Sequence, residues 1–343
     1  MIEILRNLMD FNTTCDTGSE KACAHYIAET LFEYGIETQL YEPYPDRVSV
    51  SAVIQGKSRE TLLLHGHIDT ASYGNPQEWL FPPDHATFHK DCICGRGALD
   101  CKSQLAVFMK IMIELKQSDI IPGRTIRFLA TADEEQGGEK GMRWIKDNTR
   151  LLENVFLALG EGGGFPFPYD GKIYYTFQTG ENCTLDDTEV PIDKSKINKR
   201  TPEEILNLGI QKGYYSESTK EYCLKCKQTE GRRLDVTTLY EGIEEFLGNA
   251  PSTKVYQEYA ELFLQSLKSV CPNAELIPVI TPGYSDNRYI RIGGIPIIGF
   301  FPLDIKNHLS GIHSANEYIS KKSLNTALFT LEKIISNLLL TEK

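Results

Sequence analysis

The sequence lacks the features that would suit it to a membrane or to nucleic acid. Its longest apolar stretches, such as residues 295–303, are interrupted by proline and glycine, whereas a helix that crosses a bilayer needs about 20 apolar residues. Basic residues are outnumbered, with 36 Lys and Arg against 47 Asp and Glu, so the formal net charge is −11. Such a charge opposes binding to phosphate backbones. We therefore expect neither a membrane partner nor a nucleic-acid partner.

A disulfide framework and a signal peptide are also missing. The nine cysteines show no framework spacing, and residues 1–11 include Glu3, Arg6 and Asp10 instead of a continuous apolar core. Both observations favour a cytoplasmic protein with free thiols. A hydrophobic fraction of 41% and a charged fraction of 24% are ordinary for a soluble protein, and 343 residues suffice for one large domain and a smaller one.

The first 160 residues alternate helix-like and strand-like segments. Ser19 can cap a helix whose apolar residues recur at helical spacing, and the leucine-rich run that follows Thr61 is typical of a central strand. This alternation predicts an α/β fold, a three-layer αβα domain with a largely parallel central sheet. The predicted strands are 48–54, 61–68, 125–131 and 155–159, and the predicted helices lie at 101–116, 139–147 and from Ser19.

The pattern changes after about residue 180 and resumes near residue 250. Thr201 followed by Pro202 and Glu204 is typical of a helix start, so we expect a small and mostly helical insertion. The α/β pattern then continues with helices at 253–270 and 321–340, a strand near Ile277 and a strand at 295–300. The predicted domains are residues 1–180 and 251–343, which form one catalytic domain, and residues 181–250, a reduced lid-like insertion.

Polar side chains end the second predicted strand. His67 and Asp69 lie two residues apart and therefore face the same way on a strand. A carboxylate beside a metal-binding imidazole fixes its tautomer and raises its basicity. The alternative is that His65 and His67 are merely polar residues that end a strand.

Acidic residues occupy further positions at the ends of predicted elements. Asp100 follows a glycine-containing turn at a helix start, and Glu161 follows an apolar strand. Asp133, Glu134 and Glu135 end another apolar strand, where like charges are costly unless a cation neutralises them. Simpler explanations remain open for these residues: a helix cap for Asp100 and a solvated acidic loop for the run of three.

One further histidine, His313, lies in a predicted loop. By itself it is a weak signal, but together these segments supply two histidines and several carboxylates, all at strand or loop ends. Such a mixture of nitrogen and oxygen donors suits zinc, and a carboxylate can bridge two ions. The candidate metal ligands are His67, Asp100, Glu135, Glu161 and His313.

These motifs resemble those of the M20 family of zinc metallopeptidases and aminoacylases, which includes aminoacylase-1, acetylornithine deacetylase, succinyl-diaminopimelate desuccinylase and carboxypeptidase G2. The resemblance covers about residues 1–180 and 250–340, and the SDNRYIR segment is most similar to the aminoacylase-1 branch. The matching motifs, in chain order, are HGHIDT, GRGALDCKSQLA, TADEEQGGEKG, LGEGGG, SDNRYIR and HSANE.

The resemblance implies a role for each candidate ligand. His67 and Glu161 would hold one zinc ion, Glu135 and His313 would hold another, and Asp100 would bridge the two. The implied cofactor is two Zn²⁺ per chain, with Co²⁺ or Mn²⁺ as substitutes. Family members also have a cis peptide bond after the bridging aspartate, which here is the bond that follows Asp100.

The resemblance also implies a reaction. A metal-bound hydroxide would attack an amide carbonyl, with Glu134 as the general base and Asp69 orienting His67. Asn287 and Arg288 would bind the substrate, and the Arg288 guanidinium would pair in a fork with a free carboxylate. The alternative for Arg288 is a structural ion pair with Asp286.

The chain departs from the family in the insertion. Family members with a dimerisation, or lid, domain usually supply from it a histidine that helps to stabilise the oxyanion in the neighbouring active site, but here no histidine lies between His89 and His308. The oligomeric state therefore stays open. Replacement donors could be Arg200, Arg232, Arg233 or His308. One interpretation of the Cys223/Cys226 pair is half of a structural zinc site, with Cys92 and Cys94 as the other half. The alternative is that these cysteines are ordinary free thiols.

The predicted function is zinc-dependent hydrolysis of an amide bond in an N-acyl amino acid or small peptide with a free carboxylate. The chain would then be an aminoacylase, a deacetylase or a carboxypeptidase. Two alternatives are a metal-binding pseudoenzyme or binding module with a remodelled lid, and a specialised biosynthetic amidohydrolase. Retention of all five ligands and of Glu134 favours catalysis.

Overall fold

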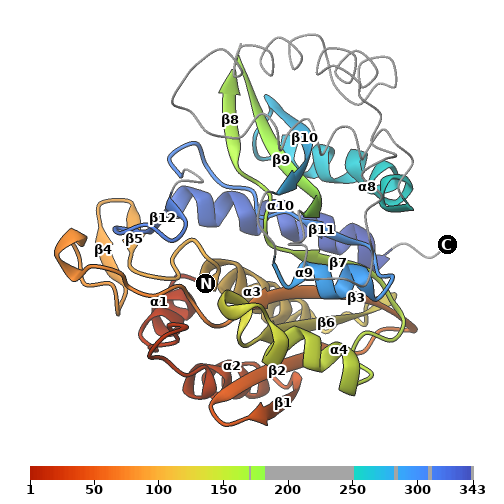
Figure 1. Ribbon diagram of the computed structural model, residues 1–343. Helices are drawn as coiled ribbons and strands as arrows, with labels where there is room; N and C mark the ends of the chain where they lie inside the picture. Colours follow the sequence, from red (N-terminus) through yellow and green to blue (C-terminus); the bar gives the residue numbers. More distant parts are fainter. Residues whose placement is uncertain (170, 182–250, 282–284, 308–310, 341–343) are drawn as a thin grey trace, which may run out of the picture.

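The computed structural model describes residues 1–169, 171–181, 251–281, 285–307 and 311–340 (Figure 1). Residues 182–250, which make up nearly all of the predicted insertion, lie outside the described residues. So do the helix start predicted at Thr201, the Cys223/Cys226 pair and the replacement oxyanion donors predicted above.

The described part of the chain alternates helices and strands as the sequence predicts. The helices are α1 Ile2–Met9, α2 Lys21–Glu33, α3 Lys102–Gln117, α4 Trp144–Asn148, α8 Pro251–Lys268, α9 Asn287–Ile292 and α10 Lys321–Leu340, with short helical turns η1 Pro76–Glu78, η2 Glu134–Gln136 and η3 Glu139–Arg143. The strands are β1 Glu37–Tyr44, β2 Arg47–Ile54, β3 Ser58–His67, β4 Thr87–His89, β5 Cys92–Cys94, β6 Arg124–Thr131, β7 Val155–Gly160, β8 Pro166–Tyr169, β9 Lys172–Glu181, β10 Ala274–Thr281, β11 Ile297–Gly299 and β12 Tyr318–Ser320.

The strands β4, β5 and β12 form a small three-stranded sheet, and the other nine described strands form one large sheet that runs from β1 at the bottom of Figure 1 to β10 at the top. Its order is β1-β2-β6-β3-β7-β11-β9-β10, with β8 paired to β9. The central strands β6, β3, β7 and β11 are parallel, whereas β1, β2 and β8 pair in antiparallel fashion with their neighbours. Because the central strands run the same way, their carboxyl ends meet at one edge of the sheet.

Helices cover both faces of this sheet, which confirms the predicted αβα layers. Along β3, Leu62 and Leu64 pack in one apolar cluster with residues of α2, α3 and α10. Leu63 points to the opposite face and packs with Ile145 of α4 and Ile290 of α9. This alternation follows from the two-residue period of a strand. None of the described helices is both long and apolar enough to span a bilayer.

Most predicted elements lie where the sequence places them. The closing helix α10 has the predicted bounds, and the strands β2, β3, β6 and β7 differ by at most a few residues. The segment predicted as one helix at 139–147 is a short π-helical turn followed by α4. The sequence interpretation did not include the edge strand β1 or the strands β8 and β9.

Candidate metal centre

Two predicted ligands lie at the ends of neighbouring parallel strands. His67 is the last residue of β3, and Glu161 directly follows β7, which pairs with β3. Their side chains meet beyond the strand ends, where His67 Nε2 is 3.3 Å from Glu161 Oε2. The His67 side chain is buried and that of Glu161 is only 14% exposed. The strand-end position that the sequence predicts therefore brings these two groups together.

Asp100 lies between the two histidines. Its Oδ1 atom is 3.1 Å from His67 Nε2, and its Oδ2 atom is 3.2 Å from His313 Nε2. The turn before it requires glycine, because Gly95 and Gly97 have φ values of 140° and 82°, in the left-handed region. The peptide bond between Asp100 and Cys101 is cis, as the resemblance implied.

Glu135 and His313 complete the cluster on the other side of Asp100. Glu135 lies in the turn η2, and its Oε2 atom is 3.1 Å from His313 Nε2. The preceding Asp133 has a left-handed φ of 71°, which turns the chain sharply after β6. All five predicted ligands are thus gathered in one place, in two sets that share Asp100.

Asp69 contacts this cluster in a way that the sequence did not predict. The acceptor for His67 Nδ1 is the backbone carbonyl of Asp69, at 2.8 Å, whereas the Asp69 carboxylate is 3.7 Å away. That carboxylate instead accepts hydrogen bonds from the backbone amides of Glu134 and Glu135, at 3.1 and 2.9 Å. Asp69 therefore connects the His67 strand end to the turn that carries the predicted base and a ligand.

The two histidines hold protons tightly when no cation is present. Burial opposes a charge on His67, yet the surrounding acidic groups raise its pKa well above 6.5. Hydrogen bonds to Asp100 and Glu135 raise the pKa of His313 to about 10. Burial acts against the charge on Asp100, but its hydrogen bonds from both histidines outweigh this effect and lower its pKa.

Other carboxyl groups at the site are shifted the opposite way. Burial and the charge of Glu161 raise the pKa of Glu134 well above its ordinary value. Burial raises the pKa of Glu161 to about 7 against the opposing effect of His67, and burial also raises that of Asp286 to about 8. So many acids in one buried place favour a cation, because a positive charge would relieve their mutual repulsion.

The side chains present fit a divalent metal ion. Glu135 Oε1 and Glu161 Oε1 are buried and receive no hydrogen bond from the described residues. Potential ligand atoms lie within 4.8 Å of one another in three overlapping groups, two of which have Asp100 in common. Imidazole nitrogens with carboxylate oxygens are a donor set that suits zinc.

The predicted substrate residues lie beside the ligands but make contacts within the chain. Asn287 Nδ2 donates to the Glu161 carbonyl, at 3.0 Å, and to Gln178 Oε1, at 2.9 Å. Arg288 Nη2 donates to the Gly137 carbonyl, at 2.6 Å, and its guanidinium lies 4.7 Å from the ring centre of Tyr289. Their roles in substrate binding stay predictions.

Two residues at this site were quoted within sequence motifs but given no role. Arg96 and Glu317 form a buried ion pair of 2.8 Å next to Asp100. Arg96 belongs to the GRGALD motif and Glu317 to the HSANE motif, so their separation along the chain conceals the contact. The only available signal was that each lies a few residues from a ligand.

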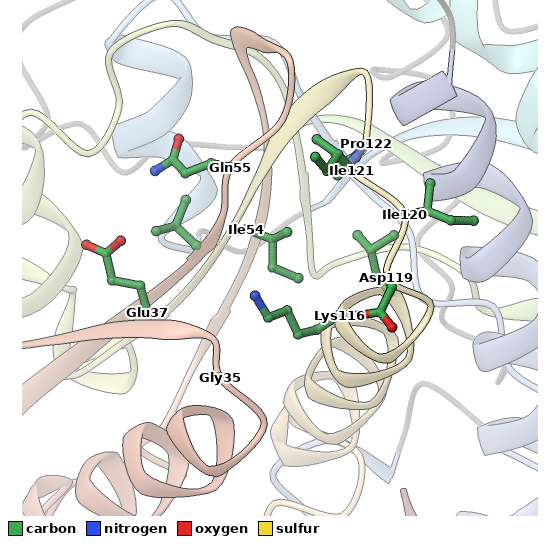
Figure 2. A pocket seen from close by; sticks show the side chains of 11 residues that line it. Gly35, Glu37, Ile54, Gln55, Lys116, Asp119, Ile120, Ile121 and Pro122 are labelled. Carbon is green, nitrogen blue, oxygen red and sulfur yellow. The ribbon is translucent and has the colours of Figure 1, made fainter.

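A cavity of about 360 Å³ has none of the predicted metal ligands in its lining, and Figure 2 shows the residues that do line it. Its lining includes Gly35, Ile54, Lys116 and Pro122. Ile54 ends β2 and pairs with Ile126 near the start of β6, so the cavity is at the end of the sheet opposite to the ligands. It is therefore not a substrate pocket for the cluster described above.

Solved structures of similar fold include metallopeptidases. An M20 family metallo-carboxypeptidase from Sulfolobus solfataricus matches with a TM-score of 0.67 and 17% identity, over 98% of each chain. Human carnosine dipeptidase 1 matches with a TM-score of 0.65 and 11% identity, over 98% of this chain and 96% of that one. At such identities the likeness concerns the fold alone.

Relatives found by sequence comparison include desuccinylases. A probable succinyl-diaminopimelate desuccinylase of Staphylococcus aureus (strain MRSA252) is 26% identical over 244 residues, which are 71% of this chain and 56% of the relative. The chain thus spans little more than half the length of the curated relatives it matches. The model of peptidase family M20/M25/M40 matches residues 63–337, which include all five predicted ligands. The chain belongs to peptidase family M20/M25/M40.

Proposed function

We propose that this chain hydrolyses an amide bond in an N-acyl amino acid or a small peptide that carries a free carboxylate. The observation that carries the proposal is the position of Asp100, whose two oxygens are 3.1 Å from His67 Nε2 and 3.2 Å from His313 Nε2. A carboxylate between two ligand sets is what a paired metal centre requires. The names of relatives support the substrate class, since they describe a desuccinylase and a metallo-carboxypeptidase.

The five ligands would hold two zinc ions. His67, Glu161 and one oxygen of Asp100 form the first set, and Glu135, His313 and the other oxygen of Asp100 form the second. Zinc in these positions would supply Lewis acidity that polarises the amide carbonyl and makes water more acidic.

Glu134 would act as the general base. Its carboxylate would accept a proton from the attacking water and deliver that proton to the nitrogen of the leaving amine. One observation supports this role: the Asp69 carboxylate accepts a hydrogen bond from the Glu134 backbone amide, at 3.1 Å, which fixes Glu134 beside the ligands.

Arg288 and Asn287 would bind the substrate. A guanidinium matches a carboxylate with two parallel hydrogen bonds, which suits recognition of an amino acid or peptide terminus. Arg288 contacts the carbonyl of Gly137, two residues beyond Glu135, so a bound carboxylate would lie near the ligand-bearing turn.

The two parts of the chain that flank the insertion would form one catalytic domain. The strands β9 and β10 lie on either side of residues 182–250 and pair with each other in parallel fashion. This pairing supports a domain made of residues 1–180 and 251–343, with residues 181–250 as a separate insertion.

The test is hydrolysis by the full chain after loading with zinc or cobalt. The zinc-loaded protein should release free amine from at least one member of a panel of N-acyl amino acids and dipeptides. Chelation should abolish the release, and Glu134→Gln should lower kcat by about 10²–10⁴-fold. Glu139→Gln is a matched control, because Glu139 is an exposed acid of the same segment that pairs with Arg143.

The proposal fails if the metal-loaded protein is inert across the panel. It also fails if Glu134→Gln and Glu139→Gln have equal rates, because the activity would then not depend on the proposed base.

A further inference from the structure

We propose that Arg96 and Glu317 are positioning residues that hold the His313 loop against Asp100 and thereby create the second metal-binding set. This inference rests on the proposed function, since it concerns the assembly of the same metal centre. The second set consists of Asp100, Glu135 and His313.

Glu317 fixes the backbone at Asp100. Its Oε1 atom accepts hydrogen bonds from the amides of Leu99, at 2.6 Å, and Asp100, at 3.0 Å. The Glu317 carbonyl also accepts from the amide of Gly95, at 2.9 Å. A residue of the HSANE segment thus holds both ends of the glycine-containing turn that carries the bridging aspartate.

Arg96 ties the same turn to the His313 loop. Its Nη1 atom donates to Glu317 Oε2, at 2.8 Å, and to the Ser314 carbonyl, at 3.2 Å. Its Nη2 atom donates to the carbonyls of His313, at 3.4 Å, and Ser72, at 2.9 Å, and its Nε atom donates to Ser72, at 3.2 Å. All five N–H groups of the guanidinium therefore have acceptors, which lie on two separate segments of the chain, at Ser72 and at residues 313–317.

The surroundings make this pair rigid. The Arg96 and Glu317 side chains are 3% and 0% exposed, and the guanidinium lies 5.2 Å from the ring centre of Trp79. Burial of a charged pair is costly unless its remaining hydrogen-bonding groups are satisfied, and here the donors of Arg96 are satisfied by ligand-bearing segments. Lysine has the charge but lacks the planar fork of donors.

The second set should depend on this pair more than the first set does. His67 and Glu161 are held at the ends of paired strands in the central sheet. His313 lies in a loop, its side chain is 55% exposed, and its φ is 56°. Without the hydrogen bonds from Arg96, the loop would lose contacts that place His313 within reach of Asp100.

The experiment is a zinc titration of the metal-free full chain in competition with a chromogenic chelator, with circular dichroism to check the fold. Wild type should show two sites. Glu317→Gln keeps an oxygen for the two amides but places an NH₂ group where Arg96 needs an acceptor. Both Glu317→Gln and Arg96→Lys should weaken one site by about 10–100-fold and change the other by less than about threefold.

Two further variants identify the affected site and control for the loss of an ion pair. In a His313→Ala background, the addition of Glu317→Gln should change the affinity of the remaining site by less than about threefold. Glu60→Gln removes another Arg–Glu ion pair of 2.8 Å, between Glu60 and Arg124, which lies at the end of β3 opposite to His67. This variant should leave the zinc affinity of both sites unchanged.

The outcomes separate this inference from the proposed function. A wild-type chain that binds no zinc would overturn both. Two zinc sites in the wild type that are unchanged in Glu317→Gln and Arg96→Lys would overturn the inference alone. Equal weakening of both sites, or failure of both variants to fold, would show that the pair supports the whole fold and not the second set, and would also overturn it.

Discussion

The two sides of the candidate metal centre contain the same kinds of donor but are built differently. On one side, His67 and Glu161 extend from paired parallel strands, and the His67 side chain is 1% exposed. On the other side, Glu135 lies in a short turn and His313 lies in a loop. The His313 side chain is 55% exposed. Asp100 belongs to both sides.

The difference shows which interactions fix the positions of the predicted ligands on each side. Backbone hydrogen bonds of the sheet place the strand-end ligands, and these bonds form whenever the domain folds. Glu135 and His313 lie outside paired strands, although β12, which follows the His313 loop, pairs with β5. Their positions therefore also depend on side chains, namely the Asp69 carboxylate, which accepts from the Glu135 amide, and Arg96, which donates to the His313 carbonyl. We therefore expect metal binding to add more order to the loop side than to the strand side.

The largest effect should come from the residue that joins the two sides. Asp100→Ala should lower kcat/KM by about 10⁴-fold or more, because it removes a ligand from each set and leaves the histidines without their common partner. Elemental analysis of the purified variant should find less than the wild-type zinc content. Two retained zinc ions per chain would contradict the bridging assignment.

The next largest effect on activity should come from Glu134, which would act in the reaction as the base and would bind neither zinc ion. Glu134→Gln should lower kcat by about 10²–10⁴-fold while it leaves the zinc content unchanged, because the amide cannot accept the proton. Parallel measurements of kcat and bound zinc test this separation. A variant that loses zinc together with activity would place Glu134 among the ligands instead.

A pair of histidine variants compares the two sides directly. In the metal-free protein, His67→Ala should lower the free energy of unfolding by about 1–3 kcal/mol, because it leaves buried carboxyl groups without their partner. His313→Ala should cost at most about 1 kcal/mol, because that side chain is half exposed. Urea unfolding of both variants measures the difference in the free energy of unfolding. Equal losses in the two variants would contradict the distinction between a strand side and a loop side.

The smallest expected effect is the dependence of zinc affinity on pH. Contacts with Asp100 and Glu135 raise the pKa of His313 to about 10, so in the metal-free protein this imidazole is protonated at pH 8. Zinc can bind His313 only after the proton leaves, and zinc affinity should therefore rise as the pH approaches 10. A pH indicator in weak buffer should report proton release on zinc addition, with less release in His313→Ala. Equal release from the variant would contradict this assignment.

The strand side could be predicted from sequence because periodicity gives the strand ends. Apolar runs locate β3 and β7, and His67 and Glu161 come at the carboxyl ends of these two strands. Bringing His67 next to Glu161 required only the expectation that these strands are parallel, which the structure confirms. The edge strand β1 was missed because none of its residues is buried and its alternation of exposed and partly buried positions breaks at Leu40 and Tyr41.

The loop side could not be derived from periodicity. His313 was selected through family resemblance, since a lone histidine in a loop carries little information by itself. The pair of Arg96 and Glu317 was missed because contacts between residues 221 positions apart leave no spacing signal. Asp69 was predicted to orient His67 through its carboxylate, but the oxygen that meets His67 belongs to the Asp69 backbone, whose geometry the sequence does not encode locally.

The measurement that tests the central claim most directly is anomalous scattering at the zinc edge from crystals of the zinc-loaded chain. We predict two peaks roughly 3.5–4 Å apart, one on each side of the Asp100 carboxylate. One peak should lie near His67 and Glu161, and the other near Glu135 and His313. A single peak, or two peaks that Asp100 does not bridge, would contradict the account.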